Sequence, residues 1–374
     1  MRKIDIQLQK TFIASKDNQE FICLVYVNNL SLARRFFEKN NIKVIKEYKF
    51  LNLVAIKTKK QVVFGFENLP FIEYVSQSSH VMALVDVSRQ ILGADKVDCF
   101  GKGISVAVID TGISPHFDFV MGHNRVKKFV DLVNKCNVMY DDNGHGTFVA
   151  GVCAGSGLMS FGKLKGFASE CDIVSIKALD NNGEANAVTI LDAMEWVFDN
   201  HKKYNIKVVC MSFGSEPLGI NDPIMRGAEK LWNNGIVVVA AAGNSGPKYQ
   251  TIKSPGISSK IITVGGFNDN RDGCKFNKNF FEIAEFSSRG PAFSKIKPDL
   301  VAPSVDIVSC GTKNNYVSLS GTSVSAPMIA GICVLIIEKY PTLRPDQIKK
   351  MLLKCCKAIS HNYNLEGMGY PVIS

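Results

Sequence analysis

Residues 104–110 of the sequence are ISVAVID, an apolar run that ends in an aspartate. Four later runs have the same character: CDIVSIKAL (171–179), VVCMSF (208–213), GIVVVAAAG (235–243) and IITVGG (261–266). Continuous β-branched runs of this length are typical of strands buried on both faces of a parallel sheet. Amphipathic stretches at 187–204 and 222–234 lie between them, and we expect helices there. The alternation predicts a doubly wound α/β domain with a mostly parallel sheet.

The residues before position 85 follow a different pattern. The segments 21–27, 42–48, 51–57 and 71–77 are predicted strands, and residues 31–40 form a predicted helix capped by Ser31. A second, short helix is expected at 61–69. This β-α-β-β-α-β order predicts a small α+β domain of the ferredoxin-like type. The chain is therefore expected to have two domains, residues 1–84 and 85–374.

Composition and charge exclude several classes of protein. The chain of 374 residues is 46% hydrophobic and 21% charged, as in ordinary globular proteins. No window reaches the ~20 consecutive apolar residues of a membrane span, so no membrane partner is expected. The net charge of +10 divides into +6 for residues 1–84 and +4 for the rest, without an arginine-rich helix. This distribution favours a solvated basic surface over a nucleic-acid partner, and we expect a monomer.

The cysteines indicate the compartment. There are eleven, an odd number, and none forms a C-x-x-C pair. The cysteines therefore indicate neither a disulfide framework nor a zinc site. They indicate a reducing environment. The N-terminal residues MRKIDIQLQKTFIASKDNQE contain no apolar signal-peptide core. We expect a cytoplasmic location, and non-classical release stays open.

Three segments carry reactive side chains where an α/β sheet binds its ligands, beyond the carboxyl ends of the strands. Asp110 ends the first run, His145 lies in DDNGHGTFVAG (141–151), and Ser323 lies in SLSGTSVSAPMIAGICVLII (318–337). Taken singly, each has a structural interpretation, as a turn aspartate, a structural histidine and a helix cap. Taken together, they supply a nucleophile, a base and a group that orients the base. A position at a helix N-terminus disfavours the charged form of His145, which suits a general base.

These motifs resemble those of the subtilisin family of serine proteases. VAVIDTG (106–112), NGHGTFVAG (143–151) and GTSVSAP (321–327) match in the family's order, and AAAGNSGP (240–247), MSFGS (211–215) and FSSRGP (286–291) also fit. The resemblance covers roughly residues 88–358. It implies a Ser323–His145–Asp110 triad, with Asn244 as a side-chain donor to the oxyanion. In isolation, Asn244 could equally be a residue of a left-handed turn.

The resemblance also implies a groove for extended polypeptide substrates. One edge would pair with the substrate backbone and form one wall of the S1 pocket, which holds the side chain before the cleaved bond. A second edge would lie opposite, and a third segment would line the other wall of the S1 pocket. Small residues in that wall predict room for a sizeable apolar side chain. The three segments are Ser212, Phe213 and Gly214; Gly183, Glu184 and Ala185; and Ala241, Ala242 and Gly243.

Residues 1–84 resemble the family's propeptide, which assists folding and then acts as an intramolecular inhibitor. Its typical ending aligns with HVMAL (80–84). We therefore expect autocleavage between Leu84 and Val85. The alternative is a permanent N-terminal domain.

No cofactor and no metal are expected. Residues 154–166 lack the asparagine-bearing calcium loop of secreted members of the family, and Asp118 alone does not make a site of 6–8 oxygens. A structural calcium is thus conceivable but unsupported. His116, Asp118 and His123 are interpreted as a surface turn.

The sequence as a whole predicts a serine endopeptidase made as a self-processing zymogen. A catalytically silent peptide-binding pseudoprotease is the alternative from another class. Whether the enzyme turns over many proteins or processes one target stays open, because the groove recognises mainly backbone.

Overall fold

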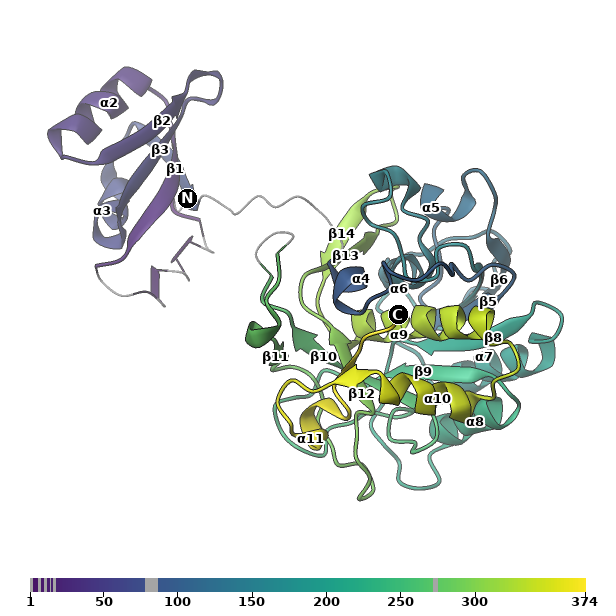
Figure 1. Ribbon diagram of the computed structural model, residues 1–374. Helices are drawn as coiled ribbons and strands as arrows, with labels where there is room; N and C mark the ends of the chain where they lie inside the picture. Colours follow the sequence, from purple (N-terminus) through teal and green to yellow (C-terminus); the bar gives the residue numbers. More distant parts are fainter. Residues whose placement is uncertain are drawn as a thin grey trace. The chain divides into compact units, whose positions relative to one another are not determined.

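The computed structural model describes residues 3–5, 8–9, 12–13, 15, 18–77, 87–271 and 275–374. The chain divides into two compact units, Met1–Met82 and Ala83–Ser374 (Figure 1). The predicted cleavage residues Leu84 and Val85 lie outside the described residues.

The smaller unit has the predicted β-α-β-β-α-β order. Its antiparallel sheet has the strand order β2-β3-β1-β4. Phe37, Val54 and Phe66 are among the side chains that form its own apolar core. The elements are β1 (Glu20–Val27), α2 (Leu30–Lys39), β2 (Lys43–Tyr48), β3 (Leu53–Lys59), α3 (Lys60–Phe64) and β4 (Ile72–Gln77).

The predicted cap of α2 is wrong by two residues. The helix begins at Leu30, and its N-cap is Asn29, whose side chain accepts a hydrogen bond from the Leu32 backbone N–H. Asn29 and Ser31 both belong to residue types that cap helices, and the earlier one holds the extended backbone of an N-cap.

The larger unit is built on a mostly parallel sheet in the order β11-β10-β9-β8-β5-β7-β6, with β12 also pairing with β10. All these pairs are parallel except that of β10 with β11. Every residue of β5 and β9 is buried, so both faces of the sheet are covered, as predicted. The strands are β5 (Ser105–Asp110), β6 (Val126–Asp131), β7 (Asp172–Lys177), β8 (Ile206–Met211), β9 (Val237–Ala241), β10 (Ile262–Asn268), β11 (Glu282–Ile283) and β12 (Leu300–Pro303).

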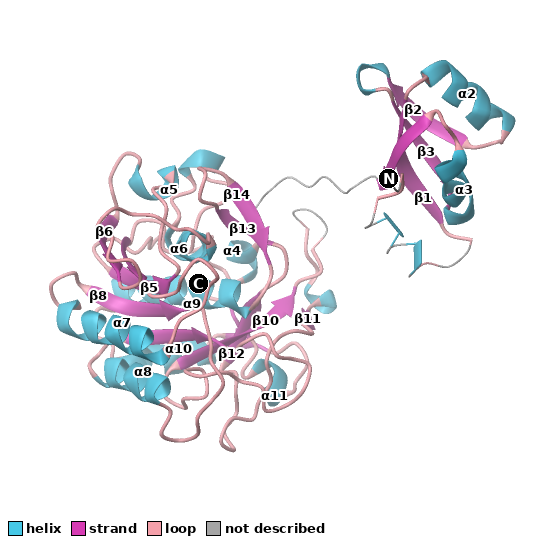
Figure 2. Cartoon of the chain, turned by 180° about the vertical axis from the view of Figure 1, so that it is seen from behind, coloured by secondary structure: helices cyan, strands magenta, loops and turns pink. Residues whose placement is uncertain are grey.

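Two helix pairs cover this sheet (Figures 1 and 2). Helices α6 (His145–Ala154) and α9 (Thr322–Lys339) pack on each other and on the central strands. Helices α7 (Ala187–Asn200) and α8 (Pro223–Asn233) form the second pair. The other α-helices and strands of the larger unit that the structure describes are α4 (Ser88–Ile91), α5 (Phe117–Val120), β13 (Ile307–Cys310), β14 (Tyr316–Leu319), α10 (Pro345–Lys354), β15 (Cys356–Lys357), α11 (Tyr363–Glu366) and β16 (Tyr370–Pro371).

Helix α9 is the core helix of the larger unit. Among the described residues it alone is long and apolar enough to cross a membrane, yet 83% of its apolar window is buried in the fold. Its apolar character follows from contacts with α6, β8, β9, β10 and β12. The helix therefore carries Ser323 in its first turn on a rigid, buried element.

Candidate active site

Asp110 lies at the carboxyl end of β5, the strand between β7 and β8. Its side chain is 1% exposed. Its Oδ1 accepts hydrogen bonds from the Thr111 backbone N–H at 2.8 Å and from the Nδ1 of His145 at 2.8 Å. Because an ionised carboxylate can only accept, the Nδ1 of His145 carries the proton and its Nε2 is free to act as a base. The structure thus brings together the predicted base and the group that orients it.

His145 is the first residue of α6, and glycines on both sides place it there. Gly144, the N-cap, has a φ of +102°, which a side chain would strain. A Cβ on Gly146 would lie 2.3 Å from the Gly112 carbonyl oxygen. Only glycine lets the first turn of α6 press against the chain that leaves β5. The glycine-flanked histidine of the sequence therefore has a steric cause.

Asp141 organises the turn before His145, and the sequence analysis missed it. It accepts hydrogen bonds from the Gly144 N–H at 2.8 Å, the Thr147 N–H at 2.8 Å and hydroxyl at 2.6 Å, and the Thr111 hydroxyl at 2.8 Å. Although burial raises the pKa of Asp141, these hydrogen bonds lower it below its ordinary value. The signal available in the sequence was the DDNG that precedes the helix, an acidic start of the kind that caps helices.

The pKa of His145 moves in the direction opposite to our expectation. Burial lowers the pKa, but the charge of Asp110, its hydrogen bond and the charge of Asp141 together raise it above 6.5. The side chain is 25% exposed, so one edge of the ring is open to solvent. The charges of Asp110 and Asp141 therefore outweigh the effect of the helix N-terminus, which lowers the pKa of His145.

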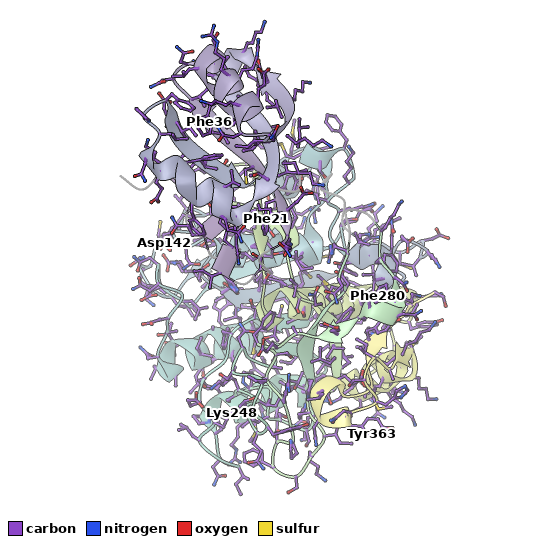
Figure 3. All side chains as sticks on the ribbon, turned by 90° about the vertical axis from the view of Figure 1, so that its left-hand side faces the viewer. Phe21, Phe36, Asp142, Lys248, Phe280 and Tyr363 are labelled. Carbon is purple, nitrogen blue, oxygen red and sulfur yellow. The ribbon has the colours of Figure 1, made fainter. Side chains whose placement is uncertain are left out.

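Lys177 is a second residue that the sequence analysis missed. It ends β7, is fully buried, and its Nζ donates to the Thr111 carbonyl at 2.7 Å, the Leu179 carbonyl at 3.0 Å and Asp142 at 2.6 Å. Asp142 is labelled in Figure 3. The lysine ties the loop after β5 to the loop before α6. No motif revealed it, because a lysine at the end of an apolar run looks like an exposed strand end.

Ser323 and Asn244 lie around the N-terminus of α9. The Oδ1 of Asn244 accepts from the Thr322 N–H at 2.9 Å and the Thr322 hydroxyl at 3.0 Å. This leaves the amide Nδ2 as a donor on the other side. A Cβ built on Gly321 would lie 3.2 Å from that Nδ2 and 3.3 Å from the Oγ of Ser323. The glycine thus keeps open a small space that both side chains border.

The two halves of the candidate site are joined by helix packing. Helix α6 carries His145, helix α9 carries Ser323, and the two helices are in contact. Within the described residues, Ser323 makes no side-chain hydrogen bond to His145. Asp110 and His145 form one bonded pair, and Asn244 and Ser323 border one open space.

The expected substrate-binding residues lie in two loops and at the end of β9, whose last residue is Ala241. Residues 183–185 lie in an exposed turn closed by Asp180, whose backbone N–H donates to the Glu184 carbonyl at 2.9 Å. This turn is beside the loop of His145, since Asn143 donates to the Asn181 carbonyl at 3.0 Å. Among the other two sets, Ser212, Ala241 and Ala242 are buried, Phe213 and Gly243 are half-buried, and Gly214 is exposed.

The expected surface turn at His116 and Asp118 is wrong, because both side chains are 1% exposed. With Cys310 they form a cluster whose candidate metal-binding atoms lie within 4.8 Å of one another. The Asp118 carboxylate, however, accepts from the Met159 N–H at 3.0 Å, the Gly157 N–H at 3.2 Å, the Tyr316 hydroxyl at 2.8 Å and the Cys310 thiol at 3.6 Å. Donors that point at the carboxylate take the place a cation would need. These residues do not fit a calcium site, which requires 6–8 oxygen ligands.

Comparisons with known proteins show the family of the chain. A family model described as the subtilase family matches residues 101–370. The serine protease AprX of Bacillus subtilis (strain 168) is 39% identical over 308 residues, which cover 75% of this chain and 68% of that protein. The thermostable alkaline protease of Halalkalibacterium halodurans is 29% identical over 344 residues, or 91% of this chain and 87% of that protein.

Solved structures give the same fold. The S41 psychrophilic protease superposes with a TM-score of 0.67 at 26% identity, over 79% of this chain and all of that one. A cold-adapted subtilisin-like serine proteinase gives a TM-score of 0.61 at 25% identity, over 74% of this chain and 92% of that one. The chain therefore belongs to the subtilase family. It is a serine endopeptidase of the subtilisin type.

Proposed function

We propose that Ser323 is the nucleophile of this protease, His145 its general base and Asp110 the residue that orients the base. The observation that carries the proposal is the 2.8 Å hydrogen bond from the Nδ1 of His145 to the buried Asp110, which leaves the Nε2 unprotonated. The Nε2 takes the proton of the Ser323 hydroxyl as its oxygen attacks the peptide carbonyl. The Nε2 then gives the proton to the leaving amine, and an acyl-enzyme on Ser323 remains. In the second half of the reaction, a water molecule gives its proton to the Nε2 and attacks the acyl-enzyme, and the proton returns to Ser323.

The oxyanion of the tetrahedral intermediate would lie in the space beside Gly321. The Nδ2 of Asn244 borders this space, and the N–H of Ser323 belongs to the first turn of α9. Both are donors, and the helix N-terminus adds a favourable dipole. The extended substrate would lie between residues 183–185 and 212–214, bound largely through its backbone.

We further propose that residues 1–84 are a propeptide, cleaved from the enzyme between Leu84 and Val85 and retained as an intramolecular inhibitor until it is degraded. The self-contained core of the smaller unit supports a separable domain. The partners are then polypeptide substrates and the propeptide, with no nucleic acid, membrane, metal or cofactor, and the enzyme is a monomer. None of the ten cysteines among the described residues forms a disulfide, which supports a reducing, cytoplasmic location.

Labelling with a fluorophosphonate tests the nucleophile. The processed wild-type chain should label at Ser323 and cleave denatured casein, and Ser323→Ala should do neither. Ser325, buried in the same helix, provides the matched control, because Ser325→Ala leaves the nucleophile in place. A chain that neither labels nor cleaves casein would be a peptide-binding pseudoprotease, and the proposal would fail.

N-terminal sequencing and intact-mass analysis test the processing. Wild-type protein should begin at Val85, and Ser323→Ala should keep its full length and its first residue. An uncut wild-type chain that still digests casein would contradict the propeptide assignment while leaving the triad intact.

A further inference from the structure

Lys253 holds a fixed position between two of the expected walls of the S1 pocket. Its backbone N–H donates to the Ala242 carbonyl at 2.9 Å. The next residue, Ser254, exchanges two backbone hydrogen bonds with Ser215, at 2.9 and 3.0 Å. Ala242 of one wall is therefore bonded to Lys253 itself, and Ser215, the residue that follows the other wall, is bonded to its neighbour Ser254. The starting point of the lysine side chain is fixed from both sides.

The aliphatic stem of Lys253 then runs between two glycines, one in each wall. A Cβ built on Gly214 would lie 2.6 Å from the Cβ of Lys253, and one on Gly243 would lie 2.5 Å from its Cγ. Any side chain at either position would clash with the stem. The stem thus fills space that the sequence analysis assigned to an apolar substrate side chain.

The ammonium group of Lys253 forms an ion pair with Glu216. The lysine side chain is 17% exposed, whereas that of Glu216 is 80% exposed. The carboxylate is therefore solvated and can leave at little cost, since exposed ion pairs are weak. The ammonium, by contrast, stays near the walls because its stem is confined.

We propose that Lys253 determines specificity by shortening the S1 pocket and ending it in a positive charge. The inference rests on the proposed function, and it takes residues 212–214 and 241–243 as the two walls of that pocket, as the resemblance to the family implies. A substrate side chain that carries a hydrogen-bond acceptor, as in glutamate or glutamine, replaces Glu216 as the partner of the ammonium. A large aromatic side chain meets the lysine stem and is rejected. Leucine, the residue at the predicted junction, lies between these extremes.

Two variants separate the stem from the charge. Lys253→Met keeps a side chain of similar length without the ammonium, and Lys253→Ala removes the stem beyond Cβ. Glu216→Gln removes the competing carboxylate. Lys248→Ala is the control, because Lys248 is an exposed lysine five residues away on the same surface loop (Figure 3). Peptide anilides that differ only in glutamate, glutamine, leucine or phenylalanine before the cleaved bond serve as substrates, with active sites counted by fluorophosphonate titration.

The wild-type enzyme should have a kcat/KM for the glutamate peptide about 10-fold or more above that for phenylalanine. Lys253→Met should lose the preference for glutamate and still reject phenylalanine. Lys253→Ala should raise the kcat/KM for the phenylalanine peptide about 10-fold or more. Glu216→Gln should raise the kcat/KM for the glutamate peptide. Lys248→Ala should have the same kcat/KM values as the wild type. If Lys253→Ala yields no titratable active sites, the charge is tested with Lys253→Met alone, by whether this variant loses the preference for glutamate.

The inference is overturned if the wild-type enzyme prefers phenylalanine and both lysine variants keep that preference. In that case Lys253 is a structural residue that does not line the S1 pocket. A wild-type chain that neither labels nor cleaves any peptide of the series overturns the proposed function, and this inference with it.

Discussion

Two buried aspartates eight residues apart, Asp110 and Asp118, have opposite surroundings. Both are 1% exposed. Asp118 accepts hydrogen bonds on both oxygens, from two backbone N–H groups, a hydroxyl and a thiol. Asp110 accepts on Oδ1 alone, and its Oδ2 is buried without a hydrogen-bond partner among the described residues.

In the proposed triad, the difference separates a structural carboxylate from a catalytic one. Donors around Asp118 spread its charge into the fold and fix the loops that bring Gly157, Met159 and Tyr316 together. Asp110 directs its charge chiefly at one histidine, and in the proposed mechanism it stabilises the imidazolium that forms during each turnover. An incompletely bonded buried carboxylate costs stability, and such a cost is typical of functional sites.

The largest effect is expected for Asp110→Asn. The amide cannot hold the Nδ1–H tautomer of His145, so kcat should fall about 10⁴-fold, the size seen for triad aspartates in other serine proteases. The melting temperature should change little, because Asp110 makes few hydrogen bonds. Kinetics per titrated active site, together with calorimetry, measure both quantities. A variant with a much lower melting temperature and an unchanged kcat per titrated site would reverse the comparison.

Asp118→Asn should produce the opposite pattern. The amide leaves at least one of the buried donors without an acceptor, and the free energy of unfolding should fall by about 3 kcal/mol. The kcat per titrated site should stay within about 3-fold of wild type, because the hydrogen-bond partners that the structure describes for the Asp118 carboxylate include none of the proposed triad residues. Asp192→Asn, at an exposed carboxylate on α7, controls for the loss of charge. A large loss of kcat in the folded enzyme would place Asp118 in the catalytic machinery.

The pH profile distinguishes the two carboxylates through His145. Its raised pKa means that kcat/KM should rise with pH with a midpoint above 6.5, since the base must be neutral. The raised pKa of His145 also contributes to the free energy of unfolding. This contribution is fully present below pH 6.5 and is lost as the pH rises through the raised pKa. Asp118→Asn should leave the midpoint where it is.

The titration of His145 in the background of Ser323→Ala, followed by NMR, gives the complementary result. Adding Asp110→Asn should lower the pKa of His145, because the charge and the hydrogen bond of Asp110 are two of the three causes that raise it. An unchanged pKa would mean that Asp110 does not control the base.

The sequence predicted the parts of this comparison that local patterns express. Apolar runs predicted β5, β7, β8, β9 and β10. Motif order predicted the pairing of Asp110 with His145, which the structure shows as a hydrogen bond, and the role of Ser323 stays a prediction. The strand β6, VKKFVD, was missed because its lysines interrupt the apolar pattern at the edge of the sheet. Its burial pattern shows neither a continuous apolar run nor a regular alternation, so periodicity does not identify this strand.

The rest depended on contacts between distant segments. The surroundings of Asp118 are supplied by residues 157, 159, 310 and 316, and no local pattern in HFD reveals them. The raised pKa of His145 required Asp141 as well as Asp110. Lys253 lies between Gly214 and Gly243 only because backbone hydrogen bonds join three loops. Tertiary pairing, not composition, decides each of these.

The smallest effect is expected for Tyr316→Phe, which removes a single donor from Asp118. Its hydroxyl lies 2.8 Å from the Oδ2, and burial together with that carboxylate raises the pKa of Tyr316. The free energy of unfolding should fall by about 1 kcal/mol, as for one hydrogen bond, measured by urea denaturation at pH 7. The kcat and the pH midpoint should not move. A shift of the midpoint would mean that the surroundings of Asp118 reach His145, and the two carboxylates could no longer be treated as independent.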